Sequence, residues 1–260
     1  MGTMKTRNQF FGSVITALLL CAFGCDGLAA PRPPLPPWPQ TALRVFGFDS
    51  AYANVPWRNL ALNEEAATLP ESWNGYALSR EGLVGSPVII PVQGLEKEVN
   101  VAPARGMIRF WFAPNWSTAS KTSGGAGPGH AARLLELVNV NGAKAQTRWA
   151  LFLNDAGDTI SLAGETKLGA AVVLQAPVEF QADVWQMITL CYSETNTLLL
   201  LNNEVIAKGD GLAAPLAWEE KDLGLVLGSD VLASVDSLAE GQFEELTTFA
   251  QWPKKSDGQE

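Results

Sequence analysis

The sequence has very few of the residues that build metal sites and nucleophilic triads. Its 260 residues include one histidine, His130, and three cysteines, of which only Cys191 lies outside the first thirty residues. A zinc site made of histidine and cysteine ligands from one chain is therefore excluded, because such a site takes four ligands. A disulfide within the folded body is excluded too, since Cys191 has no partner there. The core must be held together by packing.

Clusters of basic residues are also missing. The chain carries 18 Lys and Arg against 27 Asp and Glu, a formal net charge of -9. Proteins that bind nucleic acid need clustered Lys and Arg to neutralise phosphates, so nucleic acid is excluded as a partner. The glycine-rich stretch 123–130 lacks the Gly-Lys-Ser/Thr ending of a phosphate-binding loop, and we interpret it as a surface loop.

An export signal is present at the N-terminus. Lys5 and Arg7 precede an apolar run over 10–25, which predicts a signal peptide over residues 1–30. The run is shorter than the roughly 20 apolar residues of a spanning helix, so no transmembrane helix is expected in the mature chain. We predict a secreted or cell-surface protein cleaved by ordinary signal peptidase. Lipoprotein processing at Cys25 is the alternative.

The rest of the chain divides into a spacer, a domain and a tail. Residues 31–40 hold six prolines and predict an extended polyproline II spacer. Residues 41–252 alternate apolar and β-branched runs with turn residues, which predicts one all-β domain, and 253–260 form a polar tail. We expect strands near 42–49, 76–79, 86–92, 106–113, 132–138, 147–154, 158–163, 168–174, 184–192, 197–202, 204–208, 223–227 and 242–249.

Strand alternation assigns side chains to faces. Ile108, Phe110 and Phe112 share one face of their strand, which we expect to point into the core. Cys191 alternates with the apolar residues of its own strand, so it is expected on the opposite face as an inert thiol. The pair Asn202-Asn203 predicts a tight hairpin turn, because Asn tolerates positive φ.

Four segments together resemble a known family. They are Gly-Met-Ile-Arg-Phe-Trp-Phe-Ala-Pro from Gly106, Trp-Gln-Met-Ile-Thr-Leu-Cys-Tyr-Ser from Trp185, Leu-Leu-Leu-Asn-Asn-Glu from Leu199, and Gly-Gln-Phe-Glu-Glu-Leu from Gly241. In order and spacing they resemble the laminin-G-like jelly-roll domain of the concanavalin A-like lectin/glucanase superfamily, over roughly residues 41–250. The chain departs from that pattern at Ser193, Asn203 and Glu244. The resemblance implies an antiparallel two-sheet β-sandwich, and functions that range over sugar binding, protein binding and glycoside hydrolysis.

The carboxylates argue against hydrolysis. Glucanases of this fold place acid and nucleophile at alternate positions of one strand, and a Glu-x-Asp-x-Glu motif is absent here. Glu244 and Glu245 are adjacent, so they point to opposite faces of their strand, and Glu96 and Glu98 flank Lys97 in an expected loop. We therefore expect no catalytic residues and a non-catalytic module for a polysaccharide or a surface protein. A glucanase-like hydrolase and an architectural N-terminal domain of a larger surface protein are the alternatives.

Two tryptophans are the candidate ligand-binding residues. Among nine tryptophans, Trp116 follows Pro114 and Trp218 follows Pro215 in loop-like contexts, where a ring face can stack on a sugar. Core packing remains the favoured interpretation even for these two. No cofactor is required by the sequence, although a Ca²⁺ ion at the rim of the sandwich is a possibility. Its candidate oxygen ligands are scattered over Asp49, Asn154, Asp155 and Asp158.

Overall fold

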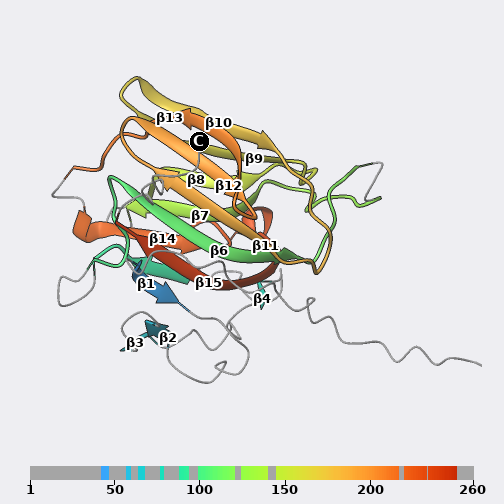
Figure 1. The fold of residues 1–260 in the computed structure, drawn as a ribbon, viewed down its shortest axis with the longest axis horizontal. Coiled ribbons are helices and arrows are strands. Elements are labelled where there is room, and N and C mark those ends of the chain that lie inside the picture. The colour runs from blue at the N-terminus through green and yellow to red at the C-terminus, as the bar shows by residue number, and fades with distance from the viewer. Residues whose placement is uncertain are drawn as a thin grey trace, which may run out of the picture.

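The computed structural model describes residues 42–46, 57–59, 64–67, 77–78, 88–93, 99–120, 124–139, 145–216, 220–232 and 234–250. These residues form two antiparallel β-sheets that pack face to face (Figure 1). The predicted signal peptide, proline-rich spacer and polar tail lie outside the described residues. The prediction of an all-β, antiparallel two-sheet sandwich is confirmed.

The larger sheet has nine strands in the order β13-β12-β11-β6-β15-β1-β2-β3, with β4 paired to β15. Its strands are β1 (Ala42–Phe46), β2 (Trp57–Asn59), β3 (Glu64–Ala67), β4 (Ala77–Leu78), β6 (Gly106–Pro114), β11 (Gln186–Tyr192), β12 (Asn196–Leu201), β13 (Glu204–Asp210) and β15 (Gly241–Phe249). The smaller sheet has six strands in the order β10-β9-β8-β7-β14-β5. They are β5 (Val88–Pro91), β7 (Ala132–Asn139), β8 (Gln146–Leu153), β9 (Thr159–Thr166), β10 (Gly169–Pro177) and β14 (Leu223–Leu227).

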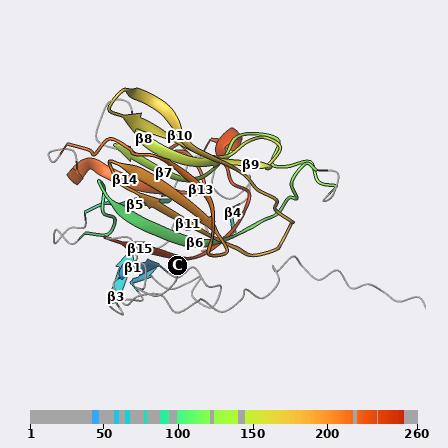
Figure 2. The same cartoon turned by 45° about the horizontal axis from the view of Figure 1, so that its top comes forward.

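Helix is confined to short turns in the described part of the chain. Two 3-10 helices, η2 (Glu220–Asp222) and η3 (Val235–Ser237), flank β14. No described helix has the length and apolar character needed to cross a bilayer. The turned view separates β8, β9 and β10 on one side of the molecule from β1 and β15 on the other (Figure 2).

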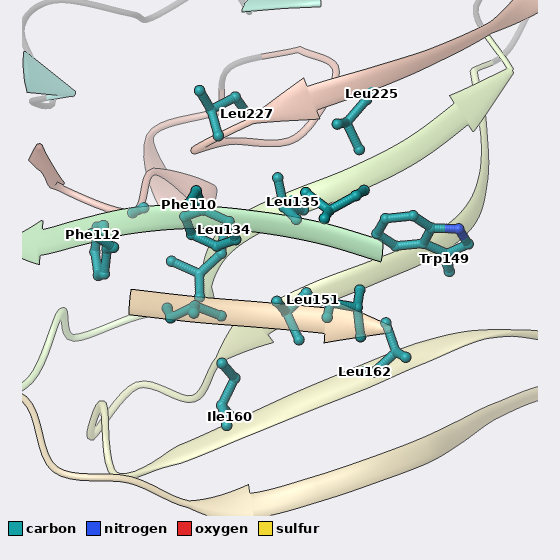
Figure 3. Packing of buried hydrophobic residues seen from close by; sticks show 14 of the residues in the cluster. Phe110, Phe112, Leu134, Leu135, Trp149, Leu151, Ile160, Leu162, Leu225 and Leu227 are labelled. Atoms are coloured by element: carbon teal, nitrogen blue, oxygen red, sulfur yellow. The ribbon is translucent and has the colours of Figure 1, made fainter. Parts of the chain in front are cut away.

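The core lies between the sheets, where the alternation of β6 predicted it. Ile108, Phe110 and Phe112 are completely buried, and the ring centroids of Phe112 and Phe243 lie 4.8 Å apart. Figure 3 shows Phe110 and Phe112 from β6 facing leucines of the six-stranded sheet, among them Leu135. Burying one such side chain contributes about 1.5 to 3 kcal/mol, so this layer stabilises the sandwich without a disulfide.

The predicted asparagine turn joins β12 to β13. Asn202 and Asn203 have φ angles of 50° and 71°. The Asn202 side chain also accepts a hydrogen bond from the backbone N–H of Met187, at 2.9 Å, and so ties the turn to β11. The turn prediction is confirmed, and the asparagine side chain explains the choice of Asn at the first position.

The two sheets meet along one side of the sandwich, where β10 and β13 lie next to each other (Figure 1). Gly209 of β13 comes so close to β10 that a Cβ at this position would lie 2.0 Å from the carbonyl oxygen of Val173. Real Cβ atoms do not approach backbone so closely, so only glycine allows the two edge strands this contact.

The outer face of the nine-stranded sheet is also buried at its central strands, β6 and β11. Met107, Arg109, Trp111 and Thr189 are at most 6% exposed on this face. Cys191 lies among them at 2% exposure, on the side predicted from alternation. Burial raises the pKa of its thiol to about 12, so the thiolate is scarce at neutral pH.

Candidate functional site

The outer face of the six-stranded sheet is partly open to solvent: Ala150 and Ser161 are only 5% exposed, but several side chains around them reach the surface. The side chains of Arg133 and Glu165 are 32% and 35% exposed, and Val172 is 57% exposed. Gln175 on β10 is exposed as well. An exposed sheet face that carries charged, polar and aromatic side chains is the best candidate for a binding surface in the described part of the chain.

One row of side chains crosses four strands of this face. The register pairs Gln175 of β10 with Ser161 of β9, Ser161 with Phe152 of β8, and Phe152 with Arg133 of β7. Their neighbours along each strand are core residues, so alternation turns all four side chains outward. Three strand spacings of about 4.8 Å give the row a length of about 14 Å. The Gln175 amide donates to the Ser161 hydroxyl at 3.2 Å.

A second row lies beside the first and has small side chains at its centre. It pairs Val172 with Ala163, Ala163 with Ala150, and Ala150 with Glu136. The two alanines leave a shallow floor between the larger side chains of the neighbouring rows. Ala150 itself is only 5% exposed, so a ligand would meet this floor chiefly at Ala163, which is half-buried.

Glu136 is an anchor within this face. It is 2% exposed, and its Oε1 accepts hydrogen bonds from Arg133, at 2.7 Å, and from the Thr147 hydroxyl. Its Oε2 accepts from the backbone N–H of Val231 at 3.1 Å. The carboxylate therefore holds the Arg133 guanidinium in place and ties the loop after β14 to the outer face.

A second ion pair borders the alanine floor. Arg148 of β8 donates to Glu165 of β9, and Glu165 pairs in register with Ala170. The face thus offers guanidinium donors, carboxylate acceptors, an amide, a hydroxyl and one aromatic ring. We call these nine residues the polar face: Arg133, Glu136, Arg148, Ala150, Phe152, Ser161, Ala163, Glu165 and Gln175. Donors and acceptors interleaved with a ring are suited to a ligand that is polar at its edges and apolar on its faces.

The structure places the candidate tryptophan Trp116 in the core. It is 8% exposed, its Nε1 donates to the carbonyl oxygen of Ala239 at 3.0 Å, and its ring packs against Phe112 and Phe180. Trp116 therefore packs inside the sandwich and does not offer a ring face for stacking. Trp218 lies outside the described residues.

The candidate calcium ligands in the described residues form a turn. Asn154 donates to Asp158 at 2.8 Å and accepts from the backbone N–H of Asp158 and Thr159. The Asn154 amide, as the largest cause, and the Thr159 hydroxyl, at 2.8 Å, both donate to the Asp158 carboxylate and hold its pKa below the usual value. Asp155 accepts from the N–H of Ala156. Within the described ranges, no three His, Cys, Asp or Glu side chains gather as a metal site.

His130 ends the glycine-rich stretch that was predicted to be a surface loop. The ring Nε2 lies 2.8 Å from the carbonyl oxygen of Leu238. Earlier in the loop, the backbone N–H of Gly127 donates to the carbonyl oxygen of Ser117, and that of Gly129 donates to the carbonyl oxygen of Asp155. The described part of this loop is thus bonded to its neighbours at several points.

The polar face was not predicted from the sequence. Alternation alone predicts that Phe152 and Ser161 point away from the core, but the row appears only when the register of four strands is known. The bulges in β7 and β10 shift that register. The available signal in the sequence was the presence of outward-pointing polar residues on several consecutive predicted strands.

Comparison with known proteins gives a likeness of fold. No family model matches the chain, and no curated protein matches it. Among solved structures, a Trypanosoma rangeli sialidase in complex with sialic acid has a TM-score of 0.53 at 10% identity over 89% of this chain and 35% of that chain. The sialidase CBM40 of Ruminococcus gnavus bound to α2,3-sialyllactose has a TM-score of 0.45 at 18% identity over 66% of this chain and 92% of that chain. The chain spans about a third of the Trypanosoma protein, and at 10% identity this likeness shows the fold alone.

Proposed function

We propose that this chain is an exported, non-catalytic module that binds a glycan on the polar face. The observation that carries the proposal is the row from Gln175 to Arg133 beside the floor of Ala150 and Ala163. A sugar ring has apolar faces, which fit Phe152 and the alanine methyl groups, and a rim of hydroxyls, which fit the flanking donors and acceptors.

Export and family are further parts of this proposal. The segment over 1–30 supports passage through a secretory pathway to the cell surface or medium. The motifs at Gly106 and Gly241 support a laminin-G-like domain of the concanavalin A-like superfamily. N-terminal sequencing of the chain after expression in a secreting host tests cleavage, and a mature end beginning at Cys25 would instead support a lipoprotein.

Calorimetric titration of the full chain against a panel of polysaccharides tests glycan binding. Phe152→Ala is the diagnostic variant, because losing contact with this ring costs about 1.5 to 3 kcal/mol, or about tenfold or more in Kd. Val205→Ala is the control, since Val205 is 50% exposed on β13 of the other sheet. Thermal melts of both variants establish that they fold. Failure of every glycan to bind, or binding unaffected by Phe152→Ala, would overturn the proposal.

The same titrations address the alternatives. Repeating them with Ca²⁺ and with a chelator tests the alternative that an ion binds at the rim of the sandwich. Release of reducing sugar from a bound polysaccharide would favour the glucanase-like hydrolase. Capture of a surface protein by the polar face, with no glycan bound, would favour a protein partner.

A further inference from the structure

The charges on the polar face cancel one another. Arg133 is bonded to Glu136, and Arg148 to Glu165, so each guanidinium faces a carboxylate. The other members of the polar face are uncharged. Each guanidinium that an acidic ligand could approach on the polar face already has a carboxylate beside it. That carboxylate would repel the ligand and oppose the favourable energy of a new ion pair.

The surroundings of the polar face add negative charge. The loop held by Glu136 carries Asp230, whose Oδ1 accepts from the backbone N–H of Leu232 and Ser234 at 3.0 and 2.9 Å. The whole chain has a formal net charge of -9. Such a field lowers the local concentration of an anionic polymer and leaves a neutral one unaffected.

The hydrogen-bonding groups also suit hydroxyls. A sugar hydroxyl both donates and accepts, whereas a carboxylate only accepts. Donors and acceptors alternate around the alanine floor: guanidinium and carboxylate in each ion pair, and amide and hydroxyl at Gln175 and Ser161. The carboxylate of an anionic sugar only accepts hydrogen bonds, so it could receive none from the carboxylate oxygens of Glu165 and would be repelled by their negative charge.

We infer that the polar face selects neutral, polyhydroxylated glycans over anionic ones such as uronate or sialylated chains. This inference rests on the proposed function and narrows it to a class of ligand. The carboxylates that neutralise Arg133 and Arg148 are thereby specificity-determining residues, because they remove the attraction that an acidic sugar needs.

Titration of the full chain with paired probes tests the inference. The neutral probes are laminarin, galactan and mannan, and the anionic probes are alginate, polygalacturonate and sialyllactose. We expect a neutral probe to bind at least about tenfold more tightly than any anionic one. Its Kd should change less than about twofold between about 20 mM and about 500 mM NaCl, since no net charge is involved. Tightest binding to an anionic probe, or a steep loss with salt, would overturn the inference.

A charge variant makes the test sharper. Glu165→Gln leaves Arg148 without its carboxylate partner, so the ratio of anionic to neutral affinity should rise several-fold at low salt. Glu194→Gln is the matched control: it changes net charge equally but lies in the exposed turn between β11 and β12. An equal rise in both variants would contradict the assigned role of Glu165.

The outcomes separate the inference from the proposed function. Anionic probes that bind best and lose affinity in Phe152→Ala would refute the neutral preference while the binding site stands. Absence of binding by all six probes would overturn both.

Discussion

We expect Gly157→Ala to lower the free energy of unfolding more than most other Gly→Ala changes in the loops. Gly157 has φ 67°, and a Cβ there would lie 2.4 Å from Cζ3 of Trp116 and 3.1 Å from Cδ of Pro128. Trp116 cannot move aside easily, because its Nε1 is bonded to the carbonyl oxygen of Ala239 and its ring is packed in the core. The added methyl therefore meets both backbone strain and a fixed ring.

The two costs can be separated with a second glycine. Gly129 has φ 74°, but a Cβ there would have no atom within 4 Å. Gly129→Ala should cost only the left-handed strain of about 1 to 2 kcal/mol. Gly157→Ala should cost about 1 to 3 kcal/mol more, which is the usual penalty of overpacking. For a domain of this size that difference lowers Tm by roughly 2 to 12 °C.

Differential scanning calorimetry of the two variants measures this difference, and a double-mutant cycle with Trp116→Phe assigns it. The smaller phenyl ring gives the methyl room, so the extra cost of Gly157→Ala should shrink in the Trp116→Phe background. Equal melting temperatures for the two glycine variants would refute the reasoning. They would show that the Trp116 ring makes room for the added methyl at no cost.

Three further predictions concern packing, the buried thiol and acid stability. Gly209→Ala should lower the urea midpoint by an amount equivalent to about 2 kcal/mol or more, because its Cβ would lie 2.0 Å from the backbone oxygen of Val173, which cannot rotate away; a midpoint like that of wild type would contradict the contact. The pKa of Cys191 is raised to about 12, so its thiol should not react with iodoacetamide in the folded protein at pH 8 but should react in urea. Peptide mass spectrometry measures the labelling. Rapid labelling of the folded protein would contradict the burial of this thiol. Burial acts to raise the pKa of Asp230, but hydrogen bonds from Ser234, among others, outweigh it and hold the pKa below its usual value. This stabilisation is present above the unfolded pKa of about 3.9 and is lost as the pH falls through the folded pKa. The Tm of Asp230→Asn should therefore decrease less than that of wild type between pH 7 and pH 3. An equal decrease in both proteins would contradict this role of Asp230.

The sequence was most informative where one strand is apolar on both sides. Gly106–Pro114 reads as a strand from its aromatic and β-branched residues, and the structure buries every residue of it. Prediction also succeeded for the Asn202-Asn203 turn, because the positive φ that such a turn needs restricts the choice of residue. Both features depend on local chemistry, which a single sequence carries.

Features that depend on pairing were out of reach. Strands β2 and β3 were not predicted; each is short, and each is defined by its partner more than by its composition. Phe152 was not recognised as a site residue because its neighbours Ser161 and Arg133 come from other strands. The row they form is set by register, and register changes with each bulge.

The order in which the nine-stranded sheet is assembled has a consequence for folding. Its middle strand, β6, lies between β11 and β15, and β1 also pairs with β15, so the first described strand meets a partner some two hundred positions further along the chain. Loops of such length close slowly. Until β15 has formed, the strands that form earlier have unpaired backbone N–H groups, which can pair with those of another chain. Truncation of the chain before β15 should therefore cause aggregation and should not give a smaller folded sandwich.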